Sequence, residues 1–167
     1  AMATDTTMDE RLKQRFLSEA YFMRAYYYFH LVRIFGGVPL TLQIENDAER
    51  WEMPRNSVAE VFNQIIADLK KANKGLWHRS EYDPKDLGRA TKGAAQGLLQ
   101  KVYLYMASPY WHDTYLSSMS RDSLYRASKE WGDSLILSGE YQLMNDYEFN
   151  FTLAGENNAE SVFELQY

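Results

Sequence analysis

The chain contains no cysteine among its 167 residues, which excludes a disulfide framework and a metal site built on thiolates. Basic residues are also in the minority, since 18 Lys and Arg face 23 Asp and Glu, for a net charge of −5. Phosphate binding requires a concentrated positive field, and no basic stripe in the sequence provides one. The composition therefore argues against nucleic acid as a partner.

Long apolar runs are missing as well. No run approaches the roughly 20 apolar residues that cross a bilayer, and residues 1–11 lack the apolar core of a signal peptide. The length suits one domain with a hydrophobic core and is short for two. We therefore expect residues 1–167 to form a single domain.

Catalytic motifs are absent too. The sequence has no HExxH, GxSxG, phosphate-binding GxxxxGK[ST] or dinucleotide-binding GxGxxG pattern, and His30, His78 and His112 fall in separate segments. We therefore predict that the protein is not an enzyme and has no metal site and no cofactor. One alternative stays open, because carboxylate pairs such as Asp146 and Glu148 are the residue type that glycoside hydrolysis uses.

What the sequence does contain is helical periodicity, which is most extensive near the N-terminus. Thr7 and Glu10 predict a capping box at the start of a helix, and Gly36 predicts its end. Apolar side chains recur three or four positions apart between these signals, which is the spacing of one helix face. The expected inward face consists of Leu12, Phe16, Ala20, Met23, Tyr27, Leu31 and Ile34.

Three further helices are predicted, over residues 57–75, 91–107 and 120–139. Each opens on a Ser or Thr that can accept a hydrogen bond from a free N–H of the first turn. In the second of these helices, Gly93 and Gly97 lie one turn apart and should let a neighbouring backbone approach closely. Glycine is unfavourable inside a helix by up to about 1 kcal/mol relative to Ala, so close packing is expected to offset that cost.

The segments between these helices read as long loops, over residues 40–56, 75–89 and 108–119. Residues 161–167 alternate between apolar and polar side chains, which is the pattern of a strand. The predicted fold class is therefore all-α, with four main helices arranged as stacked pairs, long loops, and a short strand at the C-terminal end.

Four motifs in order resemble one family. They are EAYFMRAYYYFHLVRIFGGVPL at 19–40, GRATKGAAQGLLQKVYLYMA at 88–107, SGEYQL at 138–143 and ENNAESVFE at 156–164. Together they resemble the SusD/RagB-type outer-membrane nutrient-binding lipoproteins of Bacteroidetes. The resemblance implies tetratricopeptide-like helix pairs with insertions between the partners, in agreement with the helices predicted above.

The resemblance also implies a function. Members of this family are non-catalytic surface lipoproteins that bind glycans or other nutrients and work with a SusC-like TonB-dependent transporter in oligosaccharide uptake. They are lipid-anchored in the cell outer membrane. Full-length members are longer, so we expect this chain to be a part that lacks the lipobox and the C-terminal region. The alternative is a helical-repeat module that binds another protein.

The residues most suited to contact a sugar are aromatic side chains in the predicted loops. Aromatic residues form 15% of the chain, which is a high share and includes 13 Tyr and 4 Trp. Their rings can fill the core or stack on the C–H faces of a sugar. The candidates for ligand contact, chosen by residue type and loop placement alone, are Trp51, Trp77, Tyr82, Tyr110 and Trp111.

Overall fold

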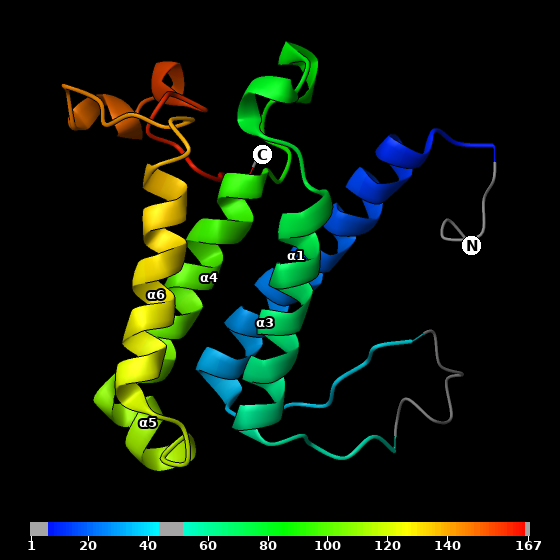
Figure 1. Cartoon of the computed structure of the whole chain (residues 1–167), viewed down its shortest axis with the longest axis vertical. Helices are drawn as coiled ribbons and strands as arrows, with labels where there is room; N and C mark the ends of the chain where they lie inside the picture. The colour runs from blue at the N-terminus through cyan, green and yellow to red at the C-terminus, as the bar shows by residue number, and fades with distance from the viewer. Residues whose placement is uncertain (1–6, 44–51, 166–167) are drawn as a thin grey trace.

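A computed structural model describes residues 7–43 and 52–165, and helices dominate it (Figure 1). The α-helices in these residues are α1 (Glu10–Phe35), α3 (Val58–Gly75), α4 (Lys92–Ala107), α5 (Pro109–Tyr115) and α6 (Arg121–Ile136). Short 3₁₀ helices lie in the connections: η2 (Arg79–Glu81), η3 (Pro84–Asp86), η4 (Glu148–Phe151) and η5 (Leu153–Gly155). No strand occurs in the described ranges, so the all-α prediction is confirmed.

The four long helices form two pairs. Helix α1 packs along α3, helix α4 packs along α6, and α3 also contacts α4, so the second pair stacks on the first. The chain runs in opposite directions within each pair, and α5 joins α4 to α6 at one end of the bundle (Figure 1). The predicted tetratricopeptide-like arrangement of stacked pairs is therefore correct.

Helix α1 begins two residues later than the Thr7 capping box predicted. Asp9 is the N-cap, and its carboxylate accepts a hydrogen bond from the Leu12 N–H at 2.9 Å. A carboxylate is favourable at a helix N-terminus because it faces the positive end of the helix dipole. The end is as predicted: Gly36 adopts a φ of +70°, which a residue with a Cβ rarely adopts.

The buried face of α1 differs from the predicted one. Tyr27, Leu31 and Ile34 are exposed, by 58, 39 and 70%. The buried residues still follow the spacing of three and four: Arg15, Ser18, Phe22, Ala25, Tyr28, Phe29 and Val32. The prediction failed because Arg15 and Ser18 make this face look polar at its start, while the outer face is equally rich in apolar side chains.

The other helix boundaries match the sequence more closely. Helix α3 opens on the predicted capping box, in which the Ser57 side chain accepts from the Glu60 N–H and the Glu60 carboxylate accepts from the Ser57 N–H. Thr91 caps α4 and Ser120 caps α6. Helix α6 ends at Ile136, a few residues before the predicted stop at Gly139.

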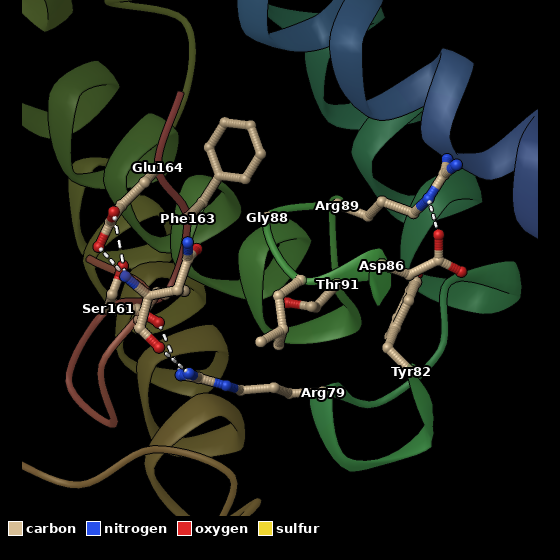
Figure 2. A pocket seen from close by; sticks show the side chains of 12 residues that line it. Arg79, Tyr82, Asp86, Gly88, Arg89, Thr91, Ser161, Phe163 and Glu164 are labelled. Carbon is tan, nitrogen blue, oxygen red and sulfur yellow. Dashed lines mark hydrogen bonds and ion pairs between the residues drawn. The ribbon is translucent and has the colours of Figure 1, made fainter. Parts of the chain in front are cut away.

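Two predicted segments need correction. Residues 109–115 form the short helix α5 rather than a loop, because Pro109 occupies the first turn, where its missing N–H costs nothing. Residues 161–165 form no strand, since their backbone has no ladder partner in the described part of the chain. This segment instead lies beside the loop 76–91 (Figure 2). Phe163 packs edge-on against Phe22, with ring centroids 4.9 Å apart.

The close approach predicted at Gly93 is made by a side chain and not by a backbone. A Cβ placed on Gly93 would lie 2.4 Å from the Tyr141 ring, so a side chain there would force that ring to move. A Cβ on Gly97 would lie 3.4 Å from Leu135, which is an ordinary contact. The ring of Tyr141 thus packs directly on the first turn of α4.

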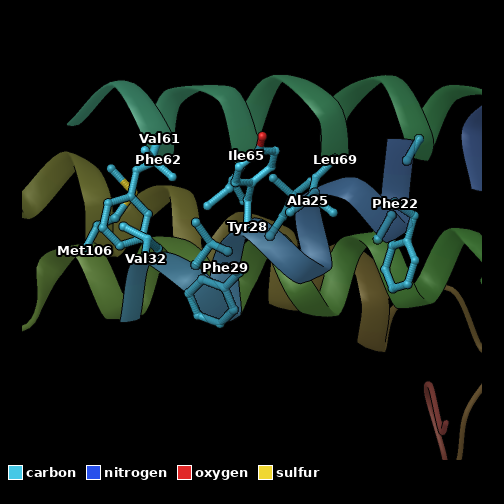
Figure 3. Close-up of a cluster of buried hydrophobic side chains, with 14 of the residues drawn as sticks. Phe22, Ala25, Tyr28, Phe29, Val32, Val61, Phe62, Ile65, Leu69 and Met106 are labelled. Atoms are coloured by element: carbon cyan, nitrogen blue, oxygen red, sulfur yellow. The ribbon is translucent and has the colours of Figure 1, made fainter. Parts of the chain in front are cut away.

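The core runs through both helix pairs. Figure 3 shows Phe62, Ile65 and Leu69 of α3 pointing at α1, with Met106 of α4 at one end of the row. These side chains are all 1% exposed or less. Full burial of such a side chain is worth about 1.5–3 kcal/mol. The core continues to Leu124 of α6, so a single apolar interior positions the loops at both ends.

Candidate functional site

The loop between α3 and α4, residues 76–91, carries two of the predicted ligand-contact residues. It lies against the C-terminal segment, residues 157–164, and the two together enclose the recess shown in Figure 2. The recess has a volume of about 30 Å³, which is room for about two water molecules. It is a joint between two segments and is too small for a sugar ring.

Arg79 holds the loop 76–91 against the C-terminal segment through hydrogen bonds. Its Nη1 donates to the carbonyl oxygens of Asn158 at 2.8 Å and Ser161 at 3.0 Å, and its Nη2 donates to the carbonyl of Asn157. Asn157 has a φ of +53°, and its N–H donates to the Glu164 carboxylate at 3.2 Å. The planar guanidinium can serve several acceptors at once, so one side chain positions the whole segment.

A cluster of alternating charges ties the same loop to α1. Asp86 accepts from Arg15 at 3.3 Å and from Arg89 at 2.8 Å, and Arg89 also donates to Glu19 at 3.0 Å. The hydrogen bond from Arg89 holds the pKa of Asp86 below its ordinary value. Burial raises the pKa of Glu19, although Arg89 and Arg15 oppose that rise. Both arginines face carboxylates, so the cluster is a structural link.

Trp77 and Tyr82 lie together in this loop, with ring centroids 5.5 Å apart. The guanidinium groups of Arg11 and Arg15 each lie 4.5 Å from the Trp77 ring. Tyr82 is only 8% exposed, and its hydroxyl donates to the Ala90 carbonyl at 2.8 Å. Burial raises the pKa of Tyr82 to about 12. In this arrangement both rings pack against the protein itself.

Tyr110 and Trp111 lie on α5, at the opposite end of the bundle (Figure 1). Trp111 is 7% exposed and packs against Phe62 of α3 and Tyr105 of α4. Tyr110 is 63% exposed, and its ring lies 6.2 Å from that of Tyr115. Tyr110 is thus the most accessible of the predicted residues that the structure describes.

The structure therefore does not bring the predicted residues into one group. The loop 76–91, which carries Trp77 and Tyr82, lies at one end of the helix bundle, and α5, which carries Tyr110 and Trp111, lies at the other (Figure 1). Trp51 lies outside the described residues.

A second aromatic pair was not singled out from the sequence as a site. Tyr147 is the residue before η4 and Phe151 is its last residue. Their side chains are 72 and 74% exposed, with ring centroids 5.2 Å apart. They border a cavity of about 220 Å³, which also has Asn150, Asn158 and Glu160 in its lining. The signal that could have found them is the recurrence of aromatic residues at Tyr147, Phe149 and Phe151 in an irregular segment.

Among the described residues, no group of three or more His, Cys, Asp and Glu side chains could hold a metal ion. None of the helices in residues 7–43 and 52–165 has both the length and the apolar character needed to cross a membrane.

The fold and the surface define a class of protein: stacked helix pairs of the tetratricopeptide type, with aromatic side chains exposed at both ends. Comparison with known sequences gives the family. A family model described as "Starch-binding associating with outer membrane" matches residues 2–104, which is more than half of the chain. The chain belongs to this SusD-like family, as its motifs indicated.

Individual relatives agree with this assignment. A SusD-like protein of Bacteroides ovatus is 31% identical over 164 residues, which cover 98% of this chain and 28% of that protein. A crystal structure of a SusD superfamily protein from Parabacteroides distasonis is 32% identical, with a TM-score of 0.85 over 99% of this chain and 33% of its own. The chain therefore spans about a third of these relatives or less.

Two other similar structures have been solved for proteins whose descriptions name a carbohydrate. One is of a protein solved with a xylogluco-oligosaccharide; it is 31% identical, with a TM-score of 0.76 over 97% of this chain and 31% of its own. The other is of a laminarin-binding SusD-like protein, 27% identical, with a TM-score of 0.78 over 97% of this chain and 33% of its own. Members of the family with this fold thus bind carbohydrates.

Proposed function

We propose that this chain forms the helical scaffold of a non-catalytic protein that binds oligosaccharides at the surface of the bacterial outer membrane. The observation that carries the proposal is membership of the SusD-like family, in which similar structures bind laminarin or hold a xylogluco-oligosaccharide. The protein would be lipid-anchored and would pass its ligand to a SusC-like TonB-dependent transporter.

In this proposal the helices serve as the scaffold, and the segments between them contact the ligand. The paired helices share one core and form a rigid frame, while the connections and α5 expose the groups that can contact a ligand. Binding residues are commonly placed on loops that a rigid scaffold positions. The proposed contact residues remain Trp51, Trp77, Tyr82, Tyr110 and Trp111, and Tyr110 is the first to test because its ring is exposed.

Isothermal titration against a panel of neutral and acidic oligosaccharides tests the proposal. We expect at least one neutral oligosaccharide to bind without being hydrolysed, and Tyr110→Ala to weaken that binding about two- to tenfold, the range of one aromatic contact. Tyr125→Ala is the matched control, because Tyr125 is a 43% exposed tyrosine on α6. Absence of binding to the whole panel, or cleavage of a bound oligosaccharide, would contradict the proposal.

A second function is favoured by one observation. The outer face of α1 exposes Tyr27, Leu31, Ile34 and Phe35, which is more apolar surface than a solvent-facing helix usually shows. Such a face suits a helical-repeat module that binds a protein. Ile34→Glu would then abolish binding to the protein partner and leave oligosaccharide binding unchanged, so titration with both ligands separates the two functions.

A further inference from the structure

The cavity beside η4 is separate from every residue proposed above. Its volume of about 220 Å³ compares with about 30 Å³ for the joint in Figure 2, and it is comparable in size with a single sugar ring. Ser161 and Glu164 belong to the lining of both spaces. The segment that Arg79 holds in place therefore also lines this cavity.

One wall is aromatic. Tyr147 and Phe151 meet at an interplanar angle of 66°, so their rings form a corner rather than a stack. They remain 72 and 74% exposed, although burying such rings is strongly favourable. Two large rings fixed in a corner and left open provide apolar planes of the kind that the C–H face of a pyranose covers.

The floor is polar and held in place by its own hydrogen bonds. Asn158 donates to the Asn150 side-chain oxygen at 2.7 Å, and Asn150 donates to Glu160 Oε2 at 3.0 Å. The Met144 N–H donates to the same carboxylate oxygen at 2.9 Å. A carboxylate has about four acceptor positions, so Glu160 keeps acceptor capacity for hydroxyl groups without rearranging.

The charge of the lining points to one kind of ligand. Glu160 and Glu164 are acidic, and no Lys, Arg or His is among the described residues that line the cavity. The Met144 N–H and the Asn150 amide hold the pKa of Glu160 below its ordinary value, so this group is ionised at neutral pH. Arg79, which holds the neighbouring segment, is directed at three backbone carbonyls. A uronate or sulfated sugar would meet repulsion, whereas neutral hydroxyls would meet acceptors.

We propose that the recess between Tyr147, Phe151, Asn150 and Glu160 binds one ring of a neutral saccharide, as a contact point distinct from Tyr110. The ring lies against the aromatic corner, and its hydroxyl groups donate to the amide and carboxylate oxygens of the floor. The inference rests on the oligosaccharide-binding function proposed above and adds the place and the charge preference of the contact.

The test is isothermal titration of the full chain with neutral laminarin and xyloglucan oligosaccharides, and with oligogalacturonates as the acidic probe. We expect Tyr147→Ala/Phe151→Ala to weaken binding of the neutral oligosaccharide at least tenfold. Tyr125→Ala, which removes an exposed ring on α6, should leave it unchanged. Glu160→Gln keeps an acceptor and removes the charge, so it should bring the affinities for acidic and neutral probes closer together.

The outcomes separate this inference from the function on which it rests. Neutral binding that is equal in the wild type and in Tyr147→Ala/Phe151→Ala overturns the site and leaves the function standing. Tighter binding of oligogalacturonate than of neutral probes also overturns it. No binding by the wild type overturns both. If circular dichroism shows that the double variant is unfolded, Phe151→Leu replaces it, and unchanged affinity there is equally contrary to the proposal.

Discussion

At the scale of single residues, the helix pair α1–α3 depends on a polar contact inside its interface. Asp68 is fully buried on α3, and it accepts from Arg24 Nε and Nη2 at 2.7 Å each and from Gln64 at 2.9 Å. Arg24 belongs to the motif that resembles the SusD signature. Its role in this chain is therefore to pair with Asp68 and fix how α1 sits on α3.

We expect Asp68→Ala to lower the free energy of unfolding by about 2–3 kcal/mol. Losing one partner of a buried pair costs about 3–5 kcal/mol, and the value is reduced here because the Arg24 side chain is 27% exposed and can reach water. Urea denaturation followed by circular dichroism measures the change. Asp133→Ala is the control, because Asp133 pairs with Lys129 at the surface. Equal effects of the two changes would rule out a special role for Asp68.

A second residue-scale contact responds to pH. His112 interacts through Nδ1 with Asp113 at 2.9 Å and through Nε2 with the Met119 carbonyl at 2.8 Å. Both ring nitrogens can donate only when the imidazole is protonated. The hydrogen bonds to Asp113 and then Met119 accordingly raise the pKa of His112. The hydrogen bonds from His112 and Arg121 lower the pKa of Asp113.

The direction of the pH dependence follows from these shifts. A raised pKa means that the contribution of His112 is complete below its unfolded pKa of about 6.5 and is lost as pH rises through the folded value. A lowered pKa means that the contribution of Asp113 is present above about pH 4 and is lost as pH falls through the folded value. The contact between His112 and Asp113 therefore stabilises the fold most at pH values above about 4 and below about 6.5, where His112 is protonated and Asp113 is ionised.

We expect Asp113→Asn to lower the pKa of His112, because it replaces the charged partner with a neutral one. Titration of the carbon-bound imidazole protons by NMR measures the change. His30 is the internal control: burial, followed by Arg33, lowers its pKa, and it lies on a different helix. An unchanged His112 titration in the variant would show that Asp113 does not cause the shift.

At the scale of elements, the sequence predicted helix boundaries where the capping chemistry is local. The box of Ser57 and Glu60 and the cap at Thr91 act within one turn, so neighbouring residues were sufficient. The buried face of α1 was not predictable in this way, because polar Arg15 is buried by Asp86 and Trp77, which lie about 60–70 residues away in the chain. Helix α5 was missed because its seven residues carry too little periodicity.

The contact between α4 and Tyr141 gives a prediction at this scale. Gly93→Ala should destabilise the protein, because the new Cβ would lie within 2.4 Å of the Tyr141 ring, although Ala favours a helix by about 1 kcal/mol over Gly. Gly97→Ala, one turn later, should be neutral or stabilising by up to about 1 kcal/mol, since its nearest neighbour would lie at 3.4 Å. Thermal unfolding of the two variants measures both effects.

The matched pair makes the outcome decisive. Both changes add one methyl group to α4, and the contact with Tyr141 is the main structural difference between the two positions. If Gly93→Ala were as stable as Gly97→Ala, the contact with Tyr141 would not constrain α4.

At the scale of the whole molecule, the two helix pairs share one core. Leu69 of α3 and Leu99 of α4 are both fully buried in it. We expect unfolding to be a single cooperative transition, in agreement with the prediction of one domain. Leu69→Ala and Leu99→Ala should each lower the free energy of unfolding by about 2–5 kcal/mol and should shift the same transition.

Denaturation followed by far-ultraviolet circular dichroism and by tryptophan fluorescence checks this prediction. Coincident curves support a single unit. Two separate transitions, with each substitution affecting only one of them, would show that the helix pairs unfold independently.

The placement of the candidate site belongs to this scale, and the sequence could not predict it. Residue type and loop position selected Trp77 and Tyr82, but whether a ring is exposed depends on Arg11, Arg15 and the Ala90 carbonyl around it. Tyr147 and Phe151 were visible in the sequence as aromatic residues of an irregular segment. The lining of their cavity also includes Asn158 and Glu160, which the fold brings to them from later in the chain.

Arg79 makes hydrogen bonds to residues that lie far from it in the sequence, and this affects the order of folding. Its hydrogen bond to Asn158 spans a sequence separation of 79 residues, and its hydrogen bond to Ser161 spans a separation of 82 residues. Closing such a long loop costs entropy that is recovered only when its ends meet. The helices should consequently assemble first, and the wall beside Tyr147 should be completed last. Partly assembled molecules would then already hold their helical frame while still unable to capture ligand.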